Sequence, residues 1–168
     1  MNSPIRDIEI IQEISARVFT ENRAHLPVIV TVCKLGSLSN GRMQITSSGE
    51  YVPAQISTSI YDLMLELREV MARPGSGAWL TAEIQVTDDG RAATRFDYNS
   101  EIEWTLGQPE GRDYQLELEK YPRDAEHIPQ WWQDILDNPP AEWQPSPEWI
   151  AEMESRLGYK LSDPDEGK

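Results

Sequence analysis

The chain has 168 residues, of which 39% are hydrophobic and 26% are charged, and its formal net charge is −14. This length and composition indicate one globular unit with one core, and no apolar run approaches the ~20 residues needed to cross a bilayer. The single cysteine, Cys33, excludes an internal disulfide. It falls in an apolar strand pattern, where we expect a buried structural thiol.

The negative charge is concentrated in the C-terminal part of the chain. From residue 100 onward there are 17 acidic and 6 basic side chains, a balance of −11. Such a surface repels nucleic acid and anionic membranes and attracts basic proteins. The N-terminal residues show neither a basic start nor an apolar block, so we expect no cleaved signal and a cytoplasmic location.

Residues 3–20 are predicted to form an amphipathic helix. Ser3 and Pro4 supply an N-cap and a first-turn proline. The expected buried face repeats every three or four residues and comprises Ile5, Ile8, Ile11, Ile14, Ser15 and Val18.

A first pair of antiparallel strands and a second helix are predicted next. The β-branched run 27–35 is followed by a turn at Ser39-Asn40-Gly41 and a strand over 41–46, and residues 51–53 are typical of a short edge strand because they include Pro53. Ser59 and Asp62 have capping-box spacing at the start of a helix that runs to Arg73. The apolar stripe of this helix comprises Ile60, Leu63, Met64, Leu67, Val70 and Met71.

The stretch 78–98 predicts a hairpin whose register can be derived. With a three-residue loop at Asp88, Asp89 and Gly90, the residue numbers of two residues that face each other across the ladder add up to 178. One face of the hairpin then carries Leu80, Ala82, Ile84 and Val86 opposite Tyr98, Phe96, Thr94 and Ala92. The other face then carries Glu83 opposite Arg95. A two-residue turn would mix the faces, so we expect the three-residue loop.

Beyond Tyr98, alternation predicts two more strands, over 102–106 and 114–118, with Glu101, Glu103 and Glu117 pointing outward. A short helix begins after Pro129 and a final one runs from Ser146 to Gly158, and residues from Ser162 on are expected to fray. The sequence therefore predicts an α+β fold, an antiparallel sheet of about five or six strands with helices on one face.

Motifs for catalysis are missing from the sequence. It contains no His-x-x-x-His, Cys-x-x-Cys, Gly-x-Ser-x-Gly or Walker pattern. His25 and His127 adjoin predicted element ends, and we expect them to act as caps or surface residues. Asp97, Glu101 and Glu103 are close in sequence, but outward-pointing carboxylates in water favour a solvated surface over an acid/base pair. We expect no enzyme, cofactor or metal.

The six tryptophans favour a binding surface instead. Trp131 and Trp132 are adjacent, so a helix cannot bury both on one stripe. Exposed aromatic side chains beside carboxylates are typical of anchors in protein interfaces. The alternative is that the C-terminal segment packs its tryptophans against the sheet.

A strand opened by Trp79, the Asp89-Gly90 turn, the Phe96-Asp97-Tyr98 return and a downstream helix with Trp131 resemble the YezG-like antitoxin and immunity-protein family. The resemblance covers roughly residues 5 to 136, within an expected domain over residues 1–136, and the Pro/Trp-rich extension 137–168 departs from the family. It implies a cytoplasmic protein that binds and neutralises the enzymatic domain of a secreted polymorphic toxin, a nuclease or an NAD-degrading enzyme.

From the charge and the resemblance together we expect a proteinaceous inhibitor that occludes a basic active site. The residues expected at the partner interface are Asp88, Asp89, Glu101, Glu103, Trp104 and Trp131. Two alternatives stay open at this point. One is a secretion chaperone or adaptor that binds its client without inhibiting it, and the other is a small hydrolase.

Overall fold

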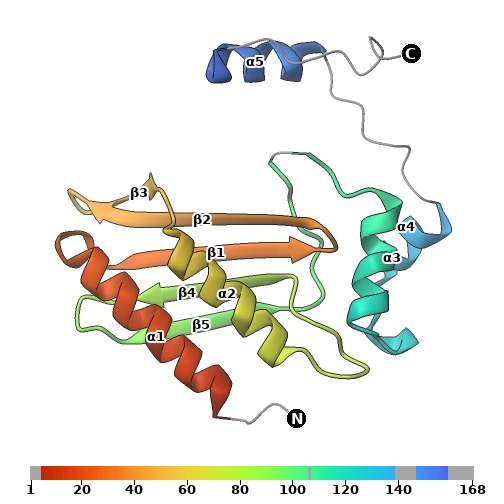
Figure 1. Ribbon diagram of the computed structural model, residues 1–168, viewed down its shortest axis with the longest axis horizontal. Helices are drawn as coiled ribbons and strands as arrows, with labels where there is room; N and C mark the ends of the chain where they lie inside the picture. Colours follow the sequence, from red (N-terminus) through yellow and green to blue (C-terminus); the bar gives the residue numbers. More distant parts are fainter. Residues whose placement is uncertain (1–4, 106, 139–146, 159–168) are drawn as a thin grey trace.

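The computed structural model describes residues 5–105, 107–138 and 147–158. Five antiparallel strands form one sheet in the order β3-β2-β1-β4-β5 (Figure 1). The strands are β1 Val28–Leu35, β2 Leu38–Ser47, β3 Glu50–Ala54, β4 Thr81–Val86 and β5 Ala92–Asp97. The predicted α+β class and the short edge strand containing Pro53 are confirmed.

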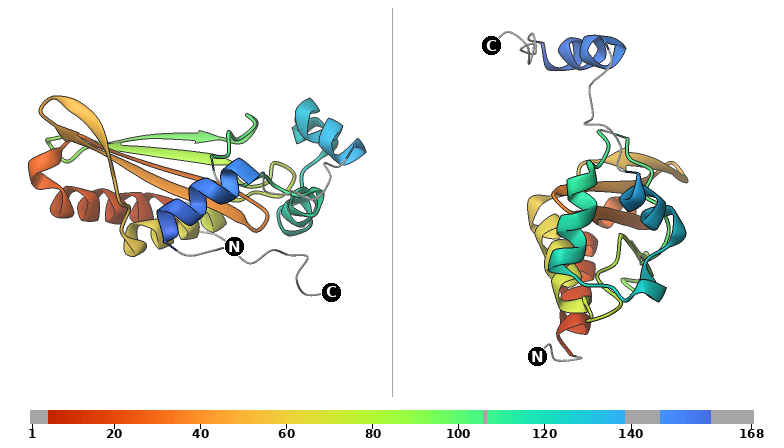
Figure 2. Two further views of the ribbon diagram at one scale, coloured as in Figure 1. Left: turned by 90° about the horizontal axis from the view of Figure 1, so that it is seen from above. Right: turned by 90° about the vertical axis from the view of Figure 1, so that its right-hand side faces the viewer.

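Two helices, α1 (Arg6–Glu21) and α2 (Thr58–Met71), cover the same face of this sheet (Figures 1 and 2). Their apolar side chains close a core with alternate residues of β1, β2 and β4. The fully buried members of this core include Ile10, Ile14, Val18, Val30, Val32, Ile60, Met64, Leu67 and Ile84. The stripe predicted for α2 packs as expected. Ser57, not Ser59, occupies the N-cap position, and its side chain makes no cap hydrogen bond.

The buried face predicted for α1 is partly wrong. Ile5 and Ile8 are 62% and 54% exposed, whereas Ile10 is fully buried. The first turns of α1 extend past the sheet edge (Figure 1). The core contacts therefore begin at Ile10 and Ile11 and continue with Ile14, Ser15 and Val18. The predicted cap at Ser3 and Pro4 lies outside the described residues.

The central hairpin has the derived register. Ala82 faces Phe96, Glu83 faces Arg95 and Val86 faces Ala92, and Gly90 has a positive φ of 81° in the three-residue loop. Strand β4 alternates strictly between half-buried and buried side chains. Strand β5 is the sheet edge, and Phe96 is only half-buried although it packs 6.3 Å from the ring of Trp79.

A pair of substitutions tests this hairpin. Phe96→Ala should lower the free energy of unfolding by about 2 to 3 kcal/mol, somewhat below the ~3 to 5 kcal/mol typical of a fully buried aromatic. Arg95→Ala, on the opposite and exposed side, should change it by under about 1 kcal/mol. Urea denaturation of both variants is the measurement, and equal small losses would contradict the assigned faces.

The turn between β1 and β2 begins three residues earlier than predicted. Leu35 faces Leu38, so Gly36 and Ser37 form the turn, and Gly36 has a positive φ of 58°. The predicted turn residues are part of β2 instead. Gly41 is needed there because the ring of Tyr61 lies only 2.7 Å from the position that a Cβ would take.

The two strands predicted after the hairpin are wrong. Residues 101–105 form no strand, and residues 111–120 form helix α3 (Gly111–Lys120). The side chain of Asp113 accepts the backbone N–H of Glu110 at 2.9 Å and so fixes the first turn of the helix. The buried residues Asp113, Tyr114 and Glu117 follow helical spacing. The strand was predicted because Tyr114, Leu116 and Leu118 alternate with polar residues.

A second apolar cluster holds α3 and α4 (Gln130–Asp137) against one end of the sheet (Figures 1 and 2). Trp132 is fully buried there and Trp131 is half-buried, as their adjacency predicts. Its other buried members are Leu35, Leu80, Ile102 and Tyr114. The core is therefore divided in two, because α3 packs on the end of the sheet and not under it.

The last element is α5 (Pro147–Leu157), where the sequence predicts a final helix. Its predicted cap, Ser146, and the end expected to fray from Ser162 lie outside the described residues. The division into residues 1–136 and 137–168 stays a prediction.

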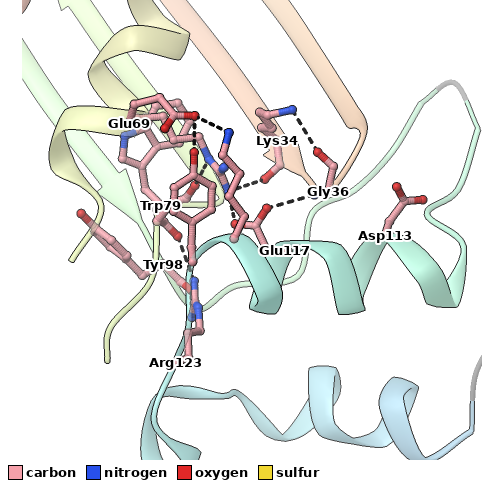
Figure 3. A network of polar contacts seen from close by, with 12 residues as sticks. Lys34, Gly36, Glu69, Trp79, Tyr98, Asp113, Glu117 and Arg123 are labelled. Carbon is pink, nitrogen blue, oxygen red and sulfur yellow. Dashed lines mark hydrogen bonds and ion pairs between the residues drawn. The ribbon is translucent and has the colours of Figure 1, made fainter. Parts of the chain in front are cut away.

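A buried ion pair joins α2 to α3. Arg68 and Glu117 contact each other and are 1% and 2% exposed. The Arg68 guanidinium also donates to the carbonyls of Trp79 at 2.7 Å and Lys34 at 3.2 Å. Glu117 accepts the N–H of Gly36 at 3.0 Å (Figure 3). The outward position predicted for Glu117 is therefore wrong.

The neighbouring carboxylate Asp113 gives a pH prediction. Burial alone would raise its pKa, but hydrogen bonds from Ser37 and from the backbone of Glu110 outweigh burial and lower it. A carboxyl group whose pKa is lowered by folding stabilises the folded state at pH values above its unfolded pKa of about 3.9. This stabilisation is lost as the pH falls through the pKa of the folded state. The stability difference between the wild type and Asp113→Asn should therefore be largest near pH 7 and shrink below about pH 4. Denaturation at several pH values measures it, and a constant difference would contradict this role.

Candidate functional site

The face of the sheet that points away from α1 and α2 carries polar side chains. Strand alternation places Thr31 of β1 and Glu83 of β4 there, and in the pairing register one row runs from Arg42 through Thr31 and Glu83 to Arg95. Cys33 lies on the same face and is half-buried against the second apolar cluster, so the burial predicted for its thiol is only partial. Within the described residues, α1 and α2 cover the opposite face. The second apolar cluster packs on one end of this face, at Cys33, and Thr31 is 4% exposed. We call the remaining part, with Arg42, Glu83 and Arg95, the open face, and this part is available to a partner.

The loop after β5 turns back at the end of the open face. The carboxylate of Asp97 accepts the backbone N–H groups of Ser100 at 2.8 Å and Asn99 at 2.9 Å. The hydrogen bond from Ser100 is the main reason why the pKa of Asp97 is lowered. Asp97 is therefore ionised at neutral pH and fixes the start of the loop that carries Glu101 and Glu103.

The sheet and this loop enclose a polar cleft of about 390 Å³, which we call the acidic cleft. Its walls are formed by Thr31, Arg42, Thr81, Glu83, Arg95, Asp97, Ser100, Glu101 and Glu103. Four carboxylates and two guanidinium groups give the lining a formal charge of −2. A cleft of this size and polarity suits a cationic side chain better than an apolar ligand.

Glu101 and Glu103 both lie in the acidic cleft, as expected for a shared surface, and both are exposed. Their exposure was predicted, although the residues form no strand. Ile102 between them is 8% exposed and anchors the loop in the second apolar cluster. Burial in that cluster is the main reason why the pKa of Tyr114 is raised to about 12, and the charges of Glu101 and Asp113 add to it. The Glu101 carboxylate therefore interacts electrostatically with a side chain of that cluster.

Asp88 and Asp89 lie elsewhere. They occupy the β4–β5 turn, at the opposite end of β5 from Glu101, and six residues of strand separate the two sites by roughly 20 Å. Asp89 pairs with Arg91 at 3.1 Å, and its hydrogen bonds with Thr87 and with the backbone of Arg91 lower its pKa. The structure therefore separates the four predicted carboxylates into two pairs.

Trp104 and Trp131 are half-buried and pack in the second apolar cluster. The indole N–H of Trp131 donates to the carbonyl of Asn99 at 2.6 Å, which holds the loop that carries Glu101. Their position beside the loop makes them supports for the acidic cleft. As partner anchors they stay predictions.

Other groups in the described residues offer less for catalysis or metal binding. Both histidines are exposed, at the 3-10 turns Arg23–His25 and Ala125–His127. Asp124, Glu126 and His127 have donor atoms within 4.8 Å of one another, but all three are exposed neighbours on a single turn. Another cavity, of about 430 Å³, lies between the β1–β2 turn and α3, where Lys34 and Glu117 already have partners. We assign no reaction to these groups.

Sequence reasoning missed Arg42 and Thr31 as members of the site. The wet-face pair Glu83 and Arg95 was available from the hairpin register. Placing Arg42 beside them requires the β1–β2 turn at Gly36 and the pairing of β1 with β4.

No helix among the described residues is long and apolar enough to span a membrane. Comparison with known proteins finds neither a protein-family model nor a curated protein that matches this chain.

Proposed function

We propose that this chain is a cytoplasmic immunity protein that binds a basic toxin domain and blocks its active site. The observation that carries the proposal is the open sheet face with its acidic cleft, on a chain of net charge −14. Protein interfaces that recognise basic partners use such complementary potentials for orientation and for fast association.

The proposed contact places a lysine or arginine of the toxin in the acidic cleft. Glu83 and Asp97 line the floor on β4 and β5, and Glu101 and Glu103 stand on the loop at its side. A guanidinium can donate two parallel N–H hydrogen bonds to one carboxylate, which adds geometric specificity to the charge attraction. A cationic active-site residue held in this way is withdrawn from its substrate.

The resemblance to the YezG-like family supports the proposal through the fold. Trp79 is fully buried against Phe96, and Asp89 and Gly90 form the turn of the hairpin. These residues determine the scaffold that presents the open face. The partner identity rests on charge and shape at the acidic cleft, and the enzymatic class of the toxin is a nuclease or an NAD-degrading enzyme by resemblance.

The test begins with affinity purification of the tagged chain from its native cell at low salt. The co-purifying protein is then expressed alone, and its enzymatic activity is measured with increasing amounts of the chain. We expect stoichiometric inhibition. A stable complex in which the client keeps full activity would overturn the proposal in favour of the secretion-chaperone or adaptor alternative.

Salt dependence gives a separate prediction. Exposed charges separated by more than about 10 Å are screened at 0.1 M ionic strength. The association rate with the partner should therefore fall as salt rises, while the dissociation rate changes less. Surface plasmon resonance at several salt concentrations measures both, and a salt-independent association rate would indicate an apolar interface.

A further inference from the structure

Strand β5 leaves a row of backbone groups directed out of the sheet. The N–H of Thr87 donates to the carbonyl of Arg91 at 2.9 Å, which sets the phase of the ladder with β4. In an antiparallel pair, residues alternate between those that bond to the partner strand and those that point away. Ala92, Thr94 and Phe96 therefore direct their N–H and carbonyl groups outward, and among the described residues only β4 pairs with β5.

This edge has little of the usual protection against strand addition, because its charged side chains, Arg95 and Asp97, line the acidic cleft on the open face. Ala92, Ala93 and Thr94 are small and exposed, and β5 contains no proline or lysine. The opposite edge, β3, is shorter and carries Pro53, which has no N–H to donate. Natural sheets protect edges that must stay unpaired with proline, lysine or short strands. The two edges of this sheet thus differ in what they can accept.

An apolar groove runs beside the unprotected edge. It has a volume of about 290 Å³ and is lined by Ile11, Gln12, Ser15, Ala16, Phe19, Gly90 and Ala92. Ile8, 54% exposed, lies one turn earlier on the same side of α1 and continues the groove. Figure 1 shows α1 extending beyond β5, so a sixth strand placed next to β5 would lie over this part of the helix.

We propose that this edge binds an extended segment of a partner protein as a sixth, added strand. The outward groups of β5 supply the main-chain hydrogen bonds, and the groove takes alternate apolar side chains of the segment. In the turn before β5, Asp89 is paired with Arg91, whereas the exposed Asp88 favours a segment with a basic residue at the matching end. The surface is the edge and not the open face, so the inference is independent of the proposed function.

Helix α1, which extends beyond β5, also disfavours a second copy of this chain as the partner at this edge. Two copies joined edge to edge through β5 would each bring α1 into the layer below the other sheet. That layer is already filled by α1 and α2 (Figure 2). An isolated extended segment brings no such helix and needs space only above α1.

The experiment pans a phage library of random ten-residue peptides on the full-length chain and measures synthetic copies of enriched peptides by fluorescence polarisation. We expect alternating apolar sequences with a basic end. Binding should weaken at least tenfold with Thr94→Pro, which removes an outward N–H while the bonds to β4 stay, and with Ile8→Glu, which places a charge on the exposed groove. Tyr51→Lys, on the opposite edge, is the matched control and should bind as the wild type does.

Amide hydrogen exchange in the peptide complex locates the contact. The amides of Ala92, Thr94 and Phe96 should exchange at least tenfold more slowly in the complex. Peptides that bind Thr94→Pro and Ile8→Glu as tightly as the wild type, or that protect other amides, would overturn the proposal. So would a wild-type dimer in sedimentation that Thr94→Pro converts to a monomer, because the edge would then be used by a second copy.

Discussion

Glu117→Ala is expected to lower the free energy of unfolding by about 3 to 5 kcal/mol, because it leaves the charge of Arg68 buried without its partner. Arg68 is 1% exposed and cannot reach water without separating α2 from Trp79 and from α3. The aromatic rings of Tyr121 and Trp79, 5.0 Å and 5.6 Å from the guanidinium, keep some attraction but do not neutralise it. Urea denaturation of the purified variant measures the loss.

Two further variants make this result specific. Glu119→Ala, on the exposed side of the same helix, should change stability by under about 0.5 kcal/mol. The double variant Arg68→Met/Glu117→Leu should recover most of the loss, since apolar side chains can replace a buried ion pair at little cost. An unchanged stability of Glu117→Ala would contradict the buried pairing of α2 with α3.

The double charge reversal Glu101→Lys/Glu103→Lys is expected to abolish protection against the toxin, because like charges placed at an interface cost several kcal/mol. Both side chains are exposed at the acidic cleft, so the fold should be nearly unaffected. Cell survival on co-expression with the co-purified toxin is the readout. Thermal unfolding of the purified variant shows whether the chain still folds.

Asp88→Lys/Asp89→Lys is the matched control for this reversal. It makes the same change of charge on exposed carboxylates at the other end of the hairpin. Protection should survive it better than the reversal at the cleft, apart from slower association. If both double variants fold and protect fully, the open face is not the inhibitory surface.

The fold was predictable where a local pattern and a turn constrain each other. The hairpin shows this, because the three-residue loop at Gly90 and the alternation from Ala82 to Val86 agree on one register. Residues 111–120 show the opposite case. Leu116 and Leu118 alternate like a strand, but the buried contacts of Glu117 and Asp113 with α2 and the β1–β2 turn fix a helix. Such long-range polar contacts leave no local signal in a single sequence.

The site was only partly predictable for the same reason. Glu101 and Glu103 were expected to be solvated and acidic, and both lie in the acidic cleft. That Arg42 lies in the same cleft depends on strand order, since β4 inserts beside β1 on the side away from β2. The composition does not show that Asp89 lies far from Glu101 and Glu103 in space. Only the length and direction of β5 put it at the far end of the sheet.

Hydrogen exchange of the complex with the co-purified toxin tests the central claim most directly. We expect slower exchange at Glu83, Arg95 and the loop 99–103, with the exchange of α2 unchanged. These residues form the open face and its acidic cleft, whereas α2 packs on the opposite face. Slower exchange over α2 with an unchanged loop 99–103 would contradict it, because the toxin would then bind the face that the helices cover.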